Sequence, residues 1–72
     1  MPNKVYKKIE LVGSSSDGIE GAINNAISTA SKTLRNLDWF EVKELRGDIV
    51  DGKVYTYQVS MNVGFRMEVP DD

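Results

Sequence analysis

The side chains able to do nucleophilic or acid–base chemistry are few in this sequence. Neither cysteine nor histidine is present, so the usual thiol nucleophiles, imidazole bases and transition-metal ligands are missing. Glu41 and Glu44 are spaced as solvated residues of a strand rather than as an acid–base pair. Asp48 and Asp51 could bind a cation, but they flank a turn, and turn formation explains them more simply. The sequence therefore predicts a protein that is not an enzyme.

Four other side chains favour binding over catalysis. Trp39, the only tryptophan, offers a large flat ring that either stacks on a flat ligand or anchors a protein interface. The Gln58 amide has both a donor and an acceptor, which suits the edge of a pyrimidine-like ring, although a solvated polar residue is the simpler interpretation. Arg46 and Arg66 would each bind a phosphate or a carboxylate of a neighbouring chain. The choice between these alternatives depends on the elements that position the four residues.

Chain length limits how much of this surface one molecule can bury. A single domain over residues 1–72 buries only about 60% of the surface that its unfolded chain exposes. Small domains compensate with disulfides, a metal or oligomerisation. Without cysteine this chain cannot form disulfides, and without cysteine and histidine it lacks the usual ligands of a structural metal. We therefore expect one domain that assembles with copies of itself.

Charge and hydropathy exclude two kinds of partner. Nine basic and eleven acidic residues give a net charge of -2, which is the wrong sign for a general nucleic-acid binder. No apolar run approaches the roughly 18 residues of a membrane span, and no signal-peptide core follows Met1. We expect a cytoplasmic protein with neither a nucleic-acid nor a membrane partner, ordered except at the tail, residues 70–72.

The first half of the chain predicts a strand and a helix. Residues 5–12 alternate between two faces, which is typical of a strand, and the glycine and serines that follow predict a turn. Asp17 with Glu20, or Ser16 just before, offers a cap for a helix. Apolar residues then recur at three- and four-residue steps. They are Ile19, Ala22, Ile23, Ala26, Ile27, Ala30, Leu34 and Leu37. The alanines in this stripe would let a sheet approach the helix closely.

The second half predicts a hairpin. Residues 39–45 alternate, with Phe40 and Val42 on the side opposite Trp39, and residues 53–67 form a longer strand with apolar odd positions. Asp51-Gly52 between them is typical of a two-residue hairpin turn. The first strand pairs most simply with the free side of the last. The prediction is an α+β fold with β-α-β-β order, a three-stranded antiparallel sheet in the order 1-3-2, and one amphipathic helix on one face.

The opposite face of this sheet is left without cover. Alternation places Trp39, Gln58 and Arg66 on it. Arg46 joins them only if a bulge near Glu44-Leu45 interrupts the alternation. A monomer would also expose long edge strands, which natural proteins avoid. We therefore expect an interface or a flat ligand on this face.

Several segments occur in an order typical of one family. They are KVYKK at 4–8, ELVGSS at 10–15, ASKTL at 30–34, LDWFEV at 37–42, RG at 46–47, YQV at 57–59 and VGFR at 63–66. Together they cover nearly the whole chain, and LDWFEV is the most specific. The sequence in this respect resembles the dodecins of bacterial type, a family of small flavin-binding proteins.

The resemblance implies a subunit of a hollow dodecamer with cubic 23 symmetry. Flavins in such cages lie in pairs near two-fold axes, between tryptophans of different subunits, and Trp39 matches that tryptophan. Gln58 matches the glutamine that bonds the pyrimidine end of the isoalloxazine. Arg46 and Arg66 match arginines near the ligand or the subunit contacts. Asp38 precedes Trp39 in the most specific segment and is assigned to the same site.

A ligand and a role are also implied by the resemblance. FMN is the expected flavin, ahead of riboflavin and FAD. Coenzyme A, which some members are reported to bind at a separate surface, is a further expectation. The implied role is non-catalytic flavin storage or buffering together with photoprotection. Other readings stay open: a structural assembly module in which Trp39 packs across a symmetry axis, a coenzyme A-binding cage, and a flavoenzyme with a substrate site beside the flavin.

Overall fold

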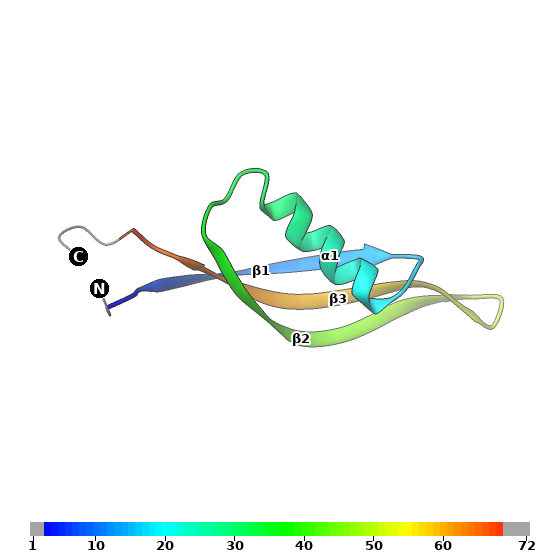
Figure 1. Cartoon of the computed structure of the whole chain (residues 1–72). Helices are drawn as coiled ribbons and strands as arrows, with labels where there is room; N and C mark the ends of the chain where they lie inside the picture. The colour runs from blue at the N-terminus through cyan, green and yellow to red at the C-terminus, as the bar shows by residue number, and fades with distance from the viewer. Residues whose placement is uncertain (1–2, 69–72) are drawn as a thin grey trace.

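The computed structural model describes residues 3–68 and consists of a three-stranded sheet with one helix (Figure 1). β1 spans Tyr6–Ser15, α1 Ile19–Ala30, β2 Leu37–Val50 and β3 Lys53–Arg66. Both β1 and β2 pair antiparallel with β3, so the strand order is β1-β3-β2. The predicted α+β fold and its strand order are confirmed. The tail expected to be disordered, 70–72, lies outside the described residues.

The β2–β3 hairpin is longer than its alternating pattern indicates. Alternation predicts a strand over 39–45, whereas β2 has 14 residues, because pairing with the equally long β3 extends it in both directions. Asp51 and Gly52 form the predicted turn with φ of 53° and 74°, the left-handed values that a two-residue hairpin needs. The hairpin tip therefore projects beyond α1, at the right of Figure 1.

The helix is shorter than its apolar stripe. α1 ends at Ala30, so the prediction that it runs to Leu37 is wrong. A turn follows over 31–33, and Asn36 adopts φ of 65°, a left-handed conformation that a helix continuing to Leu37 could not contain. Leu37 already belongs to β2, opposite Phe65, and packs against the same core from the sheet. Leu37 continues the helical spacing of apolar residues because it faces the same core as α1, although it lies in a strand.

The start of α1 also differs from the prediction. Its N-cap is Gly18, and no side chain among residues 3–68 caps the helix, so the expected cap by Asp17 or Ser16 is wrong. Gly18 has φ of 141°, a value that favours glycine and that sets the entry of the chain without a capping side chain. The Ser15 hydroxyl instead accepts a hydrogen bond from the Asp17 N–H at 2.9 Å and tightens the preceding turn.

The core lies between α1 and the inner face of the sheet, which we define as the face that α1 covers. Its buried apolar side chains are Ala22, Ala26, Ala30, Val59, Met61 and Val63. The first three are the buried residues of α1 and the last three are odd positions of β3. The expectation that small helix residues allow a close approach is confirmed. A Cβ added to Gly13 of β1 would lie only 2.9 Å from the Ala26 Cβ.

One strand of the inner face is not covered. Across the part of the chain that the structure describes, α1 packs on β1 and β3 and leaves most of β2 without a helical neighbour. Phe40, Val42 and Leu45 are consequently 46%, 50% and 54% exposed. The prediction that one helix covers this face therefore holds for two strands only. The reason is width, since a helix about 10 Å across spans two strands spaced about 4.8 Å apart but not three.

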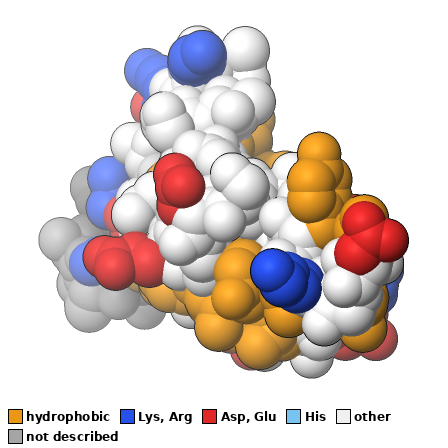
Figure 2. Space-filling view, turned by 90° about the vertical axis from the view of Figure 1, so that its right-hand side faces the viewer, with side chains coloured by type: hydrophobic (Ala, Val, Ile, Leu, Met, Phe, Trp, Pro, Cys, Tyr) orange, Lys and Arg blue, Asp and Glu red, His pale blue; other side chains and the backbone are white. Residues whose placement is uncertain are grey.

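Apolar side chains are also exposed near the hairpin tip. Ile49, Val54 and Tyr55 lie beyond the end of α1 and are each more than half exposed. Figure 2 looks onto this end of the molecule and shows hydrophobic side chains gathered at the surface rather than buried. Large exposed apolar patches on soluble proteins mark interaction surfaces.

Candidate functional site

Trp39 lies on the outer face of the sheet, opposite α1, near the start of β2. Its register partner is Gly64 of β3, and the residue is 39% exposed. Tyr6 of β1 packs beside it, with ring centroids 5.9 Å apart and ring planes inclined at 54°, a favourable tilted aromatic pair. The structure thus places Trp39 on the face that alternation predicts, within an aromatic platform that crosses the sheet.

Asp38 and Arg66 form an ion pair beside this platform. Nη1 of Arg66 lies 3.3 Å from Oδ2 of Asp38. Asp38 reaches the pair because β2 is irregular just before Trp39. The Arg66 N–H donates to the Asn36 carbonyl at 2.9 Å, and the Asn36 amide donates to the Arg66 carbonyl at 3.2 Å, which holds the backbone beneath the pair. We call this group the Trp39 cluster: Tyr6, Asp38, Trp39 and Arg66.

Gln58 and Arg46 lie together farther along the outer face. They are register partners on β3 and β2, and Gln58 is half-buried. Arg46 reaches this face because the register shifts between Val42 and Glu44, slightly before the bulge that alternation requires. Its guanidinium donates from Nη2 to Oε1 of Glu44. We call Gln58 and Arg46 the Gln58 cluster.

The two clusters do not meet within one chain. Trp39 lies over Gly64, which is six positions after Gln58 on β3. An extended strand advances about 3.3 Å per residue, so roughly 20 Å separates the clusters along the sheet. The structure therefore brings Asp38, Trp39 and Arg66 together and leaves Arg46 and Gln58 at a second place.

Charged residues cross the sheet between the two clusters. Nζ of Lys8 lies 3.3 Å from Oε1 of Glu41, and Nζ of Lys43 lies 3.3 Å from Oε2 of Glu10. The buried Ser60 hydroxyl of β3 donates to the same Glu10 oxygen at 3.0 Å. The Ser60 hydrogen bond, and then Lys43, hold the pKa of Glu10 below its ordinary value of 4.5, against a smaller opposing effect of desolvation.

We expect the Glu10 interactions to make stability depend on pH. Because the pKa of Glu10 is lower in the folded state, its contribution is fully present above about 4.5 and is lost as the pH falls through the folded-state value. Thermal unfolding of the wild type and of Glu10→Gln should differ at neutral pH and converge in acid. Glu20→Gln, which removes an exposed carboxylate of α1 together with its helix-dipole interaction, measures the effect of losing a negative charge elsewhere in the chain. Parallel pH curves for wild type and Glu10→Gln would contradict the assignment.

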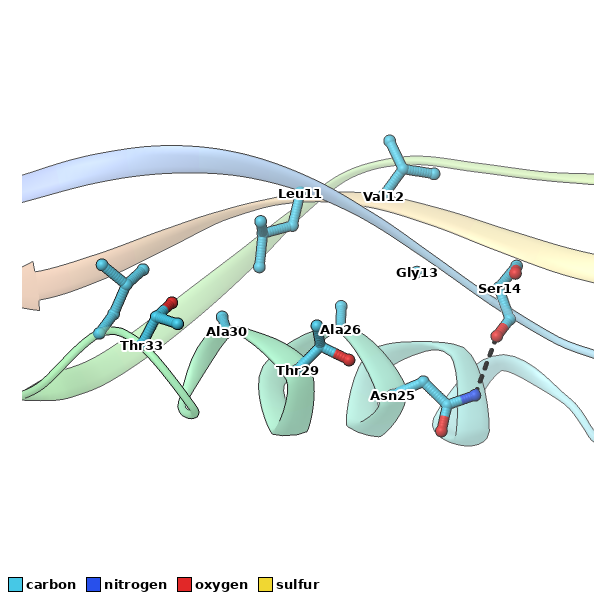
Figure 3. Close-up of a pocket in the computed structure, with 10 residues that line it drawn as sticks. Leu11, Val12, Gly13, Ser14, Asn25, Ala26, Thr29, Ala30 and Thr33 are labelled. Atoms are coloured by element: carbon cyan, nitrogen blue, oxygen red, sulfur yellow. Dashed lines mark hydrogen bonds between the residues drawn. The ribbon is translucent and has the colours of Figure 1, made fainter.

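A groove between β1 and α1 is separate from both clusters. It has a volume of about 450 Å³ and is lined on its apolar side by Leu11, Ala26 and Ala30. Near one end the Asn25 amide donates to the Ser14 carbonyl at 2.9 Å (Figure 3). None of the five predicted site residues lines it.

Within residues 3–68, no three His, Cys, Asp or Glu side chains come together as a metal site. The helix in this range is neither long nor apolar enough to cross a bilayer.

Two residues around Trp39 were not singled out from the sequence. Alternation places Tyr6 on the outer face with Lys8 and Glu10, but only the strand order brings it to Trp39. Gly64 lies inside a strand, where a glycine commonly marks a close approach of another group. The glycine within the strand is visible in the sequence, but only the register shows that the group approaching it is the Trp39 indole.

A single helix over two strands, with a partly exposed tryptophan on the other face, defines a βαββ protein whose outer sheet face and β2 strand are not covered by the helix. The family model for dodecins matches residues 5–68. The chain belongs to the dodecin family.

Individual relatives match most of the chain. A curated dodecin from Thermus thermophilus is 62% identical over 65 residues, which cover 90% of this chain and 94% of that protein. A T. thermophilus crystal structure matches with a TM-score of 0.89 and 60% identity, covering 93% of this chain and 98% of that one. The dodecin structure from Streptomyces coelicolor matches with a TM-score of 0.89 and 51% identity, covering 96% and 99%.

Proposed function

We propose that this chain is a non-catalytic flavin-binding subunit of a homododecameric cage that stores FMN and shields it from light. Trp39 carries the proposal, because its indole packs beside Tyr6 on the outer face and remains accessible. Offset stacking of two aromatic systems contributes about 1 kcal/mol beyond the area it buries. Membership of the dodecin family makes a flavin the expected partner of that ring.

Exposed apolar surface supports self-assembly. Phe40, Val42 and Leu45 on β2 are about half exposed, and within residues 3–68 α1 does not pack on them. Family membership implies a homo-oligomer. A further copy that packs on β2 would bury these side chains and also protect a long edge strand. The proposed count of twelve subunits comes from the family resemblance.

The separation of the two clusters supports a site shared between subunits. About 20 Å along the sheet is farther than three fused rings extend, so a flavin stacked on Trp39 would meet Gln58 only from another subunit. There the Gln58 amide would pair with the pyrimidine edge. Arg46, beside Gln58, or Arg66, held by Asp38, would bind the FMN phosphate. Flavin binding then requires the assembled cage.

Storage and light protection follow from the same contact. An indole is an electron donor, and stacked on an excited isoalloxazine it returns the flavin to its ground state before photochemistry occurs. The chain has no cysteine or histidine to transfer protons to a substrate. These properties suit a protein that holds a flavin without turning it over.

Absorbance, fluorescence and mass of the purified protein test the proposal together. We expect a yellow cage of twelve subunits that quenches FMN emission at saturation and binds FMN more tightly than riboflavin or FAD. Bright emission from bound FMN would exclude the quenching mechanism. A colourless cage that binds no flavin would favour a structural module, or a coenzyme A carrier if mass spectrometry finds that ligand. Steady oxidation of an added reductant would favour a flavoenzyme.

A further inference from the structure

We propose that Gly64 is a positioning residue for Trp39: its missing side chain lets the indole lie flat on β3 and leaves one ring face free to stack. The nature of the stacked ligand rests on the proposed function. The placement of the ring does not, and it can be measured on the ligand-free protein.

The geometry at Gly64 shows how the ring lies. A Cβ built there would fall within 3.0 Å of three indole atoms, Cε2, Cζ2 and Cη2, a distance that real Cβ atoms essentially never show. A point close to three consecutive atoms of a six-membered ring lies over the face of that ring rather than outside its rim. The indole therefore covers the Gly64 backbone face-on, and Gly64 is buried although it belongs to the outer face.

The backbone conformation of Gly64 gives no other reason for a glycine. The positive-φ glycines within residues 3–68 are Gly18 and Gly52, where conformation explains the residue type. Gly64 pairs with Lys8 on one side and Trp39 on the other, and the irregularity just before Trp39 places the extra residue on β2 and not on β3. What excludes a side chain at this position is the indole.

The glycine at position 64 also fixes which face of Trp39 is available. With no side chain at this position of the middle strand, the indole extends from β2 over β3 and meets Tyr6 of β1. An aromatic ring that covers a strand glycine also protects its backbone, which stabilises both. One face of the indole is occupied by β3, so each subunit offers a single stacking face in a fixed orientation. Gly64 thereby sets the geometry of the platform without touching the ligand.

A double-mutant cycle tests this role. Gly64→Ala should lower the unfolding temperature of the ligand-free protein and change the near-ultraviolet circular dichroism of its single tryptophan. In a Trp39→Ala background, the same substitution should be neutral or stabilising, because nothing then occupies the space over Gly64. Asn62→Ala, at the preceding outer-face position of β3, is the control and should leave the tryptophan signal unchanged.

FMN titration supplies the second readout. Gly64→Ala should weaken FMN binding about tenfold, which corresponds to the loss of the oriented stack. If Gly64→Ala does not fold, folding of the double variant would still support the proposal. Equal destabilisation of both backgrounds, or an unchanged tryptophan signal in Gly64→Ala, would overturn it. A wild type that binds no flavin would contradict the proposed function. The double-mutant cycle on the ligand-free protein would still decide the role of Gly64.

Discussion

Replacing Trp39 with alanine is expected to weaken FMN binding at least about thirtyfold, since a buried aromatic anchor of a binding site contributes on the order of 2–4 kcal/mol. The substitution removes the only indole of the chain and leaves Tyr6 without its partner. Trp39 is not part of the core cluster of α1 and the inner sheet face. The variant should therefore fold and assemble like the wild type. It should also no longer quench whatever FMN it retains.

The measurement is a fluorescence titration of FMN paired with light scattering for the mass of the assembly. Trp39→Phe is the matched variant, because it keeps a flat ring of smaller area and should give an intermediate affinity. FMN affinity equal to the wild type in Trp39→Ala would remove Trp39 from the site. Loss of assembly without loss of a folded subunit would instead identify Trp39 as an interface anchor.

The sequence predicts the elements of this fold better than their limits. Period-two alternation and the Asp51-Gly52 turn are local features, so the hairpin and its strand order follow from them. The residue at which α1 ends is not determined by such local features. Leu37 continues the helical spacing because a strand residue facing the same core satisfies the same pattern. The length of β2 is likewise set by pairing with β3 and not by its own alternation.

For the candidate site residues, the alternation of side chains along a strand predicts which sheet face each residue lies on. It does not predict how far apart the residues lie along the sheet. Alternation is enough to place Trp39, Gln58 and Arg66 on the outer face, and one bulge adds Arg46. It does not show that Gln58 and Trp39 are separated along β3. That separation appears only when the register is known, and the proposal of a site shared between chains rests on it. The importance of Gly64 depends on the same cross-strand register.

The second large effect is expected at Gly13, where alanine should destabilise the subunit by about 1–3 kcal/mol or more. Gly13 is buried on the inner face of β1. An added Cβ would lie 2.9 Å from the Ala26 Cβ, 3.0 Å from the Ala22 carbonyl carbon and closer still to its oxygen. A helix carbonyl cannot move aside as the end of a long side chain can. The whole of α1 would have to lift from β1, which would open the core beneath it.

Ser14→Ala is the matched control for Gly13→Ala, because Ser14 is the next residue of β1 and is exposed on the outer face. Its effect should stay within about 0.5 kcal/mol. Unfolding of both variants should be measured at the same protein concentration, since the stability of an assembly depends on concentration. Alanine is otherwise the better strand residue by roughly 0.5–1 kcal/mol, so any net loss at Gly13 underestimates the steric cost. A Gly13→Ala protein as stable as the wild type would mean that α1 can sit farther from β1, and that the small residues of the helix do not set the spacing between the two.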